Sequence, residues 1–208
     1  MDQAEGESMI TIVTKDNIHE FKDEMEQAYR LRHAVFVDEM GWEDLRKPDG
    51  REIDQFDDEH AVHMLYIENG TVLGYQRMLP SLQPHILSEV LPHLCEEGLP
   101  RSEDTWEWTR YCVAKKHRDR GRILSPVGNM LLSAIVEWGL ENGTDKIIIE
   151  MNPIWLLRLV QLHFRVRPLG LPQQIGKDSV LAVVATFDRR TLAKLQEVRG
   201  TAQSALAA

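Results

Sequence analysis

The sequence is poor in residues and runs that several common kinds of protein need. It has 2 cysteines in 208 residues, Cys95 and Cys112, and neither belongs to a C-x-x-C pair or stands at zinc-site spacing from histidines. We therefore expect a reduced protein with no metal and no resident cofactor. No apolar run is long enough to span a bilayer, and the first ten residues are acidic, unlike a secretory signal. We expect a cytoplasmic protein with no membrane contact.

Basic residues are also in short supply. The 24 Lys and Arg against 33 Asp and Glu leave a formal net charge of -9, which argues against a nucleic-acid partner, because phosphate contacts need clustered cations. H-E-x-x-H, G-x-S-x-G and the glycine-rich phosphate loop are missing as well. These absences exclude the usual zinc proteases, serine hydrolases and P-loop nucleotide hydrolases.

The size and composition are those of one globular domain. With 208 residues and 43% hydrophobic residues, the chain is long enough to bury a substantial core. We expect a single domain over residues 1–208, with flexible ends at residues 1–8 and 200–208.

Apolar spacing predicts the secondary structure. We expect strands at residues 9–14, 61–67, 72–79, 106–114, 147–151 and 179–187, and helices at residues 18–36, 123–140, from 153 and from 189. Residues 38–60 are predicted to be a long loop, and Asn69-Gly70 a hairpin turn. This order predicts an α/β fold, a three-layer sandwich built on a mixed sheet.

The first candidate site is the segment that runs from the end of the first helix through the long loop. It holds Arg32, Phe36, Trp42, Asp54 and Asp57. Taken singly, each residue is better explained as core edge or solvated surface. Their grouping in one segment favours a functional site.

Charged residues inside apolar strands form the second candidate. Glu107 and Arg110 stand in the run WEWTRY, and Arg77 stands in another apolar run. Burying these groups unpaired would be costly, so we expect a network that joins Arg32, Arg77 and Arg110 to Asp54, Asp57 and Glu107. A structural and a catalytic role are equally compatible with such a network. Glu107 and Arg110 have opposite parity, so both can line one site only if the strand is bulged or sharply twisted between them.

A basic turn before the helix predicted at residues 123–140 is the weakest of the three signals. Arg118–Arg122 reads RDRGR, similar to the Arg-x-x-Gly-x turn that holds pyrophosphate in GCN5-related N-acetyltransferases. Taken alone, it is better explained as a basic turn ahead of a helix.

Together these residues resemble the LuxI-type acyl-homoserine-lactone synthases. That family has an N-terminal Arg, Phe and Trp, two Asp three apart, an Arg in a G-x-x-R-x-x-P strand, and a Glu and Arg three apart. All eight positions are filled in order, by Arg32, Phe36, Trp42, Asp54, Asp57, Arg77, Glu107 and Arg110. The resemblance covers roughly residues 9–187 and implies a fold like that of the GCN5-related N-acetyltransferases, with a V-shaped gap between two central strands.

The resemblance implies an acyltransferase that makes a quorum-sensing signal from S-adenosylmethionine and an acyl thioester. Glu107 is expected to deprotonate the amine, directly or through water, and Asp54, Asp57, Arg77 and Arg110 to set loop position and charge around it. Arg32, Phe36 and Trp42 are expected to shape the S-adenosylmethionine pocket. The acyl thioester is expected to meet Trp108, Thr109, Tyr111, Arg118 and Trp155, although Trp155 is better explained as a core residue.

The donor and the reaction keep alternatives open. We favour acyl-CoA, as in the subgroup similar around WEWTRY, while the basic residues near Arg118 leave an acyl carrier protein possible. Two alternative functions stay open. One is acyl transfer from acyl-CoA to another amine, and the other is ligand binding without catalysis. Acyl-chain identity and oligomeric state stay open.

Overall fold

The computed structural model describes residues 9–118 and 124–207, so the predicted flexible start at 1–8 lies outside the described residues. The chain forms two compact units, each assembled from separate segments. Unit 1 comprises Met1–Arg77, Arg110–Ala134 and Gln203–Ala208, and unit 2 comprises Met78–Thr109 and Ile135–Ala202. A single domain over residues 1–208 stays a prediction.

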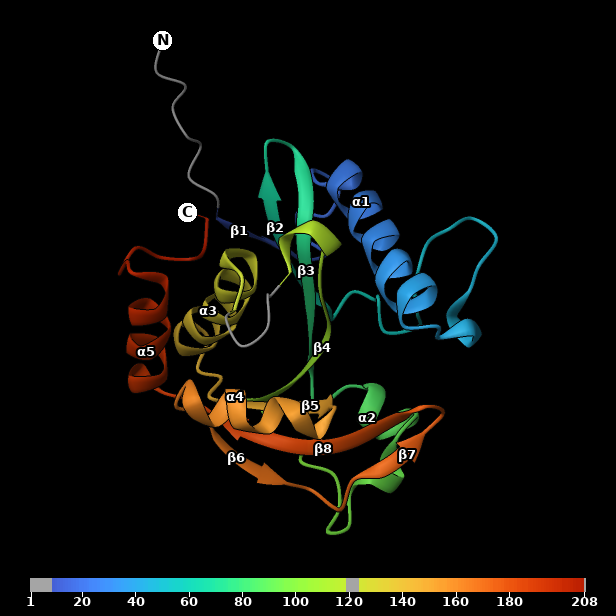
Figure 1. Ribbon diagram of the computed structural model, residues 1–208, viewed down its shortest axis with the longest axis vertical. Helices are drawn as coiled ribbons and strands as arrows, with labels where there is room; N and C mark the ends of the chain where they lie inside the picture. Colours follow the sequence, from blue (N-terminus) through green and yellow to red (C-terminus); the bar gives the residue numbers. More distant parts are fainter. Residues whose placement is uncertain (1–8, 119–123, 208) are drawn as a thin grey trace. The chain divides into compact units, whose positions relative to one another are not determined.

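The elements are those of a mixed α/β protein, as predicted (Figure 1). The strands are β1 Ile10–Val13, β2 Val62–Glu68, β3 Thr71–Pro80, β4 Thr105–Val113, β5 Lys146–Met151, β6 Arg165–Pro168, β7 Gln173–Ile175 and β8 Asp178–Thr186. The helices are α1 Lys22–Arg32, α2 Ile86–Glu89, α3 Pro126–Glu141, α4 Leu156–Gln161 and α5 Arg189–Arg199. The sequence prediction missed β6 and β7, and it ended the first helix too early, because α1 continues as a π-helical segment, His33–Glu39.

The β2–β3 hairpin turns where the sequence predicts. Asn69 and Gly70 both have positive φ, at 50° and 73°. Two successive left-handed residues are the signature of the type I′ turn, whose twist matches that of the flanking strands. Within unit 1 the strand order is β1-β2-β3, followed by the second part of β4.

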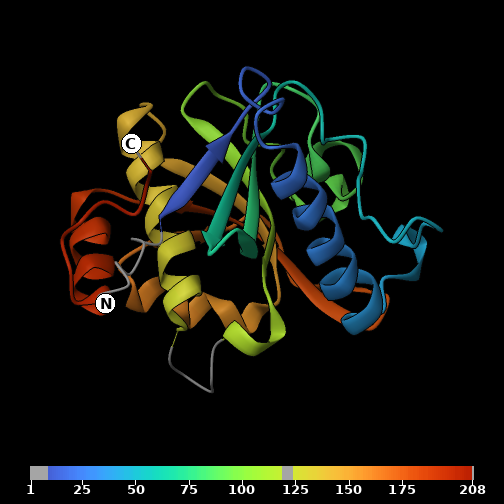
Figure 2. The same cartoon turned by 90° about the horizontal axis from the view of Figure 1, so that it is seen from above.

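Unit 1 has a helix on each face of its strands, which gives three layers (Figure 2). Tyr75 of β3 packs with Met25 and Ala28 of α1 in one buried cluster. Its neighbour Gly74 faces the other way, toward Val127 and Leu131 in the first half of α3. Adjacent strand residues point to opposite faces, so this one pair of positions places α1 and α3 on opposite sides of the strands.

The last described residues run beside β1, also within unit 1. The Ile10 backbone N–H donates to the Ala205 carbonyl at 2.7 Å, and the Ala207 N–H donates to the Ile10 carbonyl at 2.9 Å. Ala205 is fully buried. We expected fraying over residues 200–208, yet the described part of this tail bonds to a strand.

Unit 2 carries the mixed part of the sheet. Here β4 pairs in parallel with β5, and β8 pairs antiparallel with β5, β6 and β7. Leu87 of α2 and Leu94 pack against Ile148 of β5 and Val184 of β8 on one face. The ring of Trp106 on β4 meets Trp138 of α3 edge to face, with 4.9 Å between centroids. The parity of Trp106 is opposite to that of Glu107, which shares its face with Ile148.

Candidate active site

Buried charges gather in unit 1 around the loop that leads to β2. Arg32, the last residue of α1, has no exposed surface. Its Nε donates to Glu52 Oε2 at 2.6 Å, and its two Nη atoms donate to the two oxygens of Asp57 at 2.7 and 2.9 Å. A planar guanidinium bound by a forked carboxylate is among the strongest pairings available to side chains. Arg32 therefore ties the loop to the end of α1.

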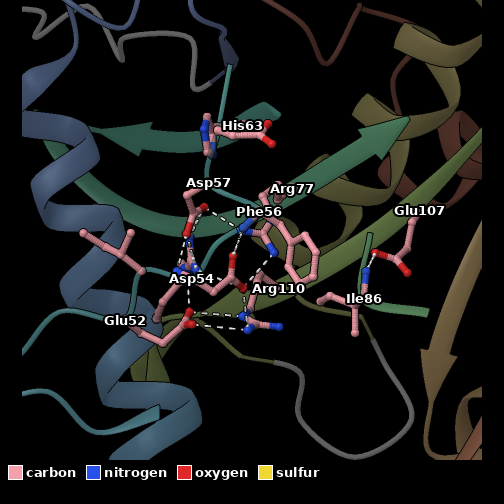
Figure 3. A network of polar contacts seen from close by, with 12 residues as sticks. Glu52, Asp54, Phe56, Asp57, His63, Arg77, Ile86, Glu107 and Arg110 are labelled. Atoms are coloured by element: carbon pink, nitrogen blue, oxygen red, sulfur yellow. Dashed lines mark hydrogen bonds and ion pairs between the residues drawn. The ribbon is translucent and has the colours of Figure 1, made fainter. Parts of the chain in front are cut away.

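Two further arginines complete this charged cluster (Figure 3). Arg77 Nη1 donates to Asp54 Oδ1 and to Asp57 Oδ1, both at 2.6 Å. Arg110 donates from Nη2 to Asp54 Oδ2 at 2.7 Å and from Nε to Glu52 Oε2 at 3.1 Å. Three guanidinium groups thus face three carboxylates, and the cluster is electrically neutral.

One predicted member of this network is wrong. We expected Glu107 as the third carboxylate, whereas the structure places Glu52 there, with 1% of its side chain exposed. The local signal was present in the sequence, because Glu52, Asp54 and Asp57 form a Glu-x-Asp-x-x-Asp run. The charge of Glu52 alone did not show that the loop buries it.

The pKa values of the three carboxyl groups follow from two opposing effects. Burial raises the pKa of Asp57, but the charges of Arg32 and Arg77 outweigh it and hold that pKa far below the usual range. Burial likewise raises the pKa of Glu52, and Arg110 and Arg32 lower it below its ordinary value. For Asp54 the opposing group is Arg77, again with a net lowering of the pKa. All three carboxylates are therefore ionised at neutral pH.

A neutral pair extends the cluster into the core. Tyr75 OH accepts a hydrogen bond from Arg32 Nη1 at 3.3 Å and lies 2.7 Å from Nδ1 of His63. Burial lowers the pKa of His63 to about 4, so the imidazole is neutral at pH 7. Its Nδ1 can then accept a hydrogen bond from the Tyr75 hydroxyl group. The sequence analysis did not single out either residue.

Two aromatic rings stack at the edge of this charged cluster. The rings of Phe36 and Trp42 are 5.2 Å apart and nearly parallel, at 19°, and the Arg110 guanidinium lies 5.7 Å from the Phe36 centroid. Phe36 lies in the π-helical segment, and its carbonyl accepts the N–H of Trp42 at 3.0 Å. π-helical turns are frequent at functional sites. Phe36 is buried, while Trp42 is half-buried.

β4 departs from regular geometry at Arg110. The φ of Arg110 is +56°, a left-handed conformation that costs a side-chain-bearing residue about 1 kcal/mol or more. The sequence analysis predicted a bulge or twist between Glu107 and Arg110 if both were to serve one site. The regular alternation of β4 is indeed broken, and the salt bridges of Arg110 with Glu52 and Asp54 hold it in this conformation.

Glu107 lies in unit 2, where its carboxylate binds the start of α2. Its Oε1 accepts the Leu87 N–H at 2.6 Å and lies 2.9 Å from His85 Nδ1, and its Oε2 accepts the Ile86 N–H at 2.9 Å. Neither Glu107 nor His85 has exposed surface. The sequence analysis did not single out His85 either.

A sequence model of the autoinducer synthase family matches residues 16–195. The chain belongs to the autoinducer synthase family. This confirms the resemblance inferred from the eight positions. As a family member, the chain has its predicted signature residues in two places: Arg32, Asp54, Asp57, Arg77 and Arg110 in the charged cluster of unit 1, and Glu107 beside α2 in unit 2.

Known autoinducer synthases and one acetyltransferase are similar along most of the chain. The isovaleryl-homoserine lactone synthase of Bradyrhizobium diazoefficiens is 38% identical over 190 residues, which cover 91% of this chain and 84% of that protein. The structure of BjaI, a CoA-dependent acyl-homoserine lactone synthase, with SAM and isopentyl-CoA superposes with a TM-score of 0.88 at 37% identity, covering 94% and 91% of the two chains. An N-acetyltransferase from Lactobacillus plantarum, at 20% identity and a TM-score of 0.54, covers 86% of this chain and 99% of its own. The predicted acetyltransferase-like fold is confirmed.

The remaining predicted site residues have different surroundings in this autoinducer synthase. Trp108 and Thr109 are each 6% exposed, and Tyr111 is half-buried. Trp155 is half-buried too, with the Arg158 guanidinium 4.9 Å from the centre of its ring. Their expected contacts with an acyl thioester stay predictions.

A cavity of about 480 Å³ opens in unit 1 next to the start of α3. Arg118 lines it together with Lys116, His117 and Ser125, and Arg118 also pairs with Glu39 at 2.6 Å. Ser125 Oγ accepts the Gly128 N–H at 3.0 Å, and Pro126 is the first helical residue, as is common at helix starts. The rest of the predicted basic turn, residues 119–122, lies outside the described residues.

Proposed function

We propose that this protein transfers an acyl group from acyl-CoA to the amine of S-adenosylmethionine and closes the lactone, releasing methylthioadenosine. The observation that carries this proposal is the 38% identity, over 91% of the chain, with an isovaleryl-homoserine lactone synthase, together with the eight filled family positions. The proposed acyl group is accordingly small and branched, of the isovaleryl class.

The chemistry of acyl transfer needs few groups. The amine nitrogen attacks the thioester carbonyl carbon, the carbon–sulfur bond breaks, and the amine proton must go to a base. Neither cysteine is suited to carry the acyl group first, because burial raises the pKa of Cys112 to about 12 and that of Cys95 above its ordinary value. Direct attack by the amine is therefore the route that these residues favour.

Lactone closure needs geometry more than acid–base help. The carboxylate of the acylated intermediate attacks the carbon next to the sulfonium, and methylthioadenosine leaves. Because the sulfonium is already a good leaving group, the protein contributes mainly by holding the folded substrate. The half-buried ring of Trp42, stacked on Phe36, is suited to a sulfonium through cation–π attraction.

We assign the charged cluster a supporting role, in which it holds the residues around the proposed binding site in place. Arg32 has no exposed surface and is engaged by Glu52 and Asp57, so we assign it to positioning the loop. Arg77, Asp54 and Asp57 have the same role. Arg110 is 10% exposed along its side chain and packs over Phe36, which joins the charged cluster to the aromatic pair.

The proposed acyl donor is acyl-CoA. The cavity beside the start of α3 carries Lys116, His117 and Arg118, and a helix start with nearby cations suits pyrophosphate. The BjaI comparison, a CoA-dependent enzyme, supports the same choice. An acyl carrier protein is the second candidate, because Lys115, Lys116 and Arg118 form a basic patch that an acidic carrier could contact.

Product analysis tests the proposal and names the donor. The purified protein is incubated with S-adenosylmethionine and a panel of straight, branched and aryl thioesters, each on coenzyme A and on carrier protein, and products are identified by mass spectrometry. We expect an isovaleryl-type homoserine lactone and methylthioadenosine from acyl-CoA. An acylated amine without methylthioadenosine would point to the rival N-acyltransferase, and the absence of any product would refute the proposal.

A further inference from the structure

Both carboxyl oxygens of Glu107 are already engaged by hydrogen bonds. Its two oxygens accept hydrogen bonds from the Ile86 and Leu87 N–H groups, and Oε1 also contacts His85. Neither side chain has exposed surface, so the hydrogen-bond partners are what distinguish them. A carboxylate held in this way is poorly placed to touch the substrate amine itself. The residue that the sequence suggests as the base therefore has both carboxylate oxygens occupied, and it contacts one titratable neighbour.

That neighbour is His85, and the hydrogen bonds determine its tautomer. As a carboxylate, Glu107 can only accept, and in that state Nδ1 of His85 carries the proton of the 2.9 Å contact. In the neutral ring, Nε2 then has a free lone pair. Within the described residues, Nε2 of His85 is buried without a hydrogen-bond partner. A carboxylate, an oriented imidazole and a bare second nitrogen are the parts of an acid–base dyad.

The dyad lies where two central strands stop pairing. Within the described part of unit 2, the β4–β5 ladder joins only Thr105–Glu107 to Lys146–Ile148, although β5 continues to pair with β8 as far as Met151. Glu107 is the last β4 residue of that ladder. The side chain that holds His85 thus projects from the point at which the two strands part.

We propose that Nε2 of His85 takes the proton from the substrate amine during amide formation, and that Glu107 acts through His85 as its positioning residue. This rests on the proposed function and deepens it. As the amine nitrogen bonds to the thioester carbonyl carbon, its proton moves to Nε2. The carbon–sulfur bond breaks, the sulfur leaves with the electron pair, and the imidazolium returns the proton to that thiolate.

The variant H85N distinguishes two roles of His85, that of a base and that of a purely structural residue. The Asn amide nitrogen takes the place of Nδ1 and still donates to Glu107, but it offers no basic nitrogen. We expect kcat for amide formation to fall by about 10²-fold or more, with KM for S-adenosylmethionine little changed. The rate should recover as the pH rises, because the amine then loses its proton to water. Wild-type kcat and an unchanged pH profile in H85N would overturn the proposal.

Two controls keep the outcome clear. H93N makes the same substitution at an exposed histidine of the following turn, Pro92–Leu94, and should leave kcat unchanged. Lactone closure from synthetic acyl-S-adenosylmethionine should also survive in H85N, because that step removes no amine proton. Loss of this second reaction would show a general structural defect and count against the proposal. A wild-type protein that forms no lactone would instead refute the proposed function.

If H85N does not fold, the wild-type protein answers the same question by NMR of ¹⁵N-labelled histidine. The ring whose signals change in E107Q identifies His85. We expect the Nδ1–H tautomer, with an Nε2 signal that shifts when S-adenosylmethionine is added. The opposite tautomer, or no shift on saturation with S-adenosylmethionine, would overturn the proposal.

Discussion

Replacing Glu52 by Gln tests whether the charged cluster depends on its balance of three positive and three negative groups. The substitution keeps the size of the side chain but removes one negative charge, and the Gln amide hydrogens would face Arg32 or Arg110 in place of an accepting oxygen. Removing one partner of a buried ion pair costs about 3–5 kcal/mol, because the remaining charge is left uncompensated. For a chain of this length, each kcal/mol lowers the melting temperature by about 2–4 °C.

The measurement is urea unfolding at pH 7 followed by circular dichroism, with calorimetry for the melting temperature. The matched control is E43Q, the same substitution in an exposed pair with Arg46, in which the two side chains are 64% and 44% exposed. Exposed pairs contribute about 0–1 kcal/mol. We expect E52Q to lose several times more stability than E43Q. Equal losses in the two variants would refute the view that burial gives the Glu52 interactions their weight.

Four further predictions concern other contacts. Burial lowers the pKa of His63 to about 4, whereas the unfolded chain protonates this histidine near pH 6.5. The contribution of neutral His63 to the free energy of unfolding is therefore full above pH 6.5 and falls by about 3 kcal/mol toward pH 4. Urea unfolding of H63N should lose this part of the pH dependence. G74A would place a Cβ 2.7 Å from Val127 and should cost about 1–3 kcal/mol in the same assay; an unchanged midpoint would contradict the close packing of α3. W42L removes the π face and should raise KM for S-adenosylmethionine by roughly 2- to 30-fold, from a cation–π energy of about 0.5–2 kcal/mol, while W42F should retain most of the affinity. R118A should raise KM for acyl-CoA and leave that for S-adenosylmethionine unchanged, and a rise in both would place Arg118 outside the donor site.

The local signals in the sequence predicted most of the fold. Asn69-Gly70 indicated the hairpin because only a few residue pairs adopt two left-handed conformations readily. β6 and β7 were missed for a physical reason as well. β1 is as short as β6 but reads ITIV, rich in β-branched residues, whereas β6 reads RVRP and β7 reads QQI. These two lack that local signal, and their pairing with β8 is a tertiary property.

The candidate site was predictable in its residue types but only partly in its pairings. Arg77 stands in an apolar strand, so an ion pair with carboxylates was expected, and the structure shows one. Its partners, Asp54 and Asp57, belong to the predicted network. The third carboxylate is Glu52 instead of Glu107, which depended on the path of the loop between Trp42 and β2 that no periodicity describes. The contact of Glu107 with His85 joins residues 22 positions apart and depends on how the segment before α2 folds back onto β4. Such contacts become visible only in three dimensions.

The contact between the tail and β1 affects how this protein can be handled. β1 is the outermost strand of its sheet, and an open strand edge invites pairing with another chain. Ala205 and Ala207 occupy the outer backbone groups of Ile10, so the tail shields that part of the edge from intermolecular pairing. Trimming the chain before residue 205 would uncover these groups and raise the risk of aggregation, even though every residue assigned to catalysis would be intact.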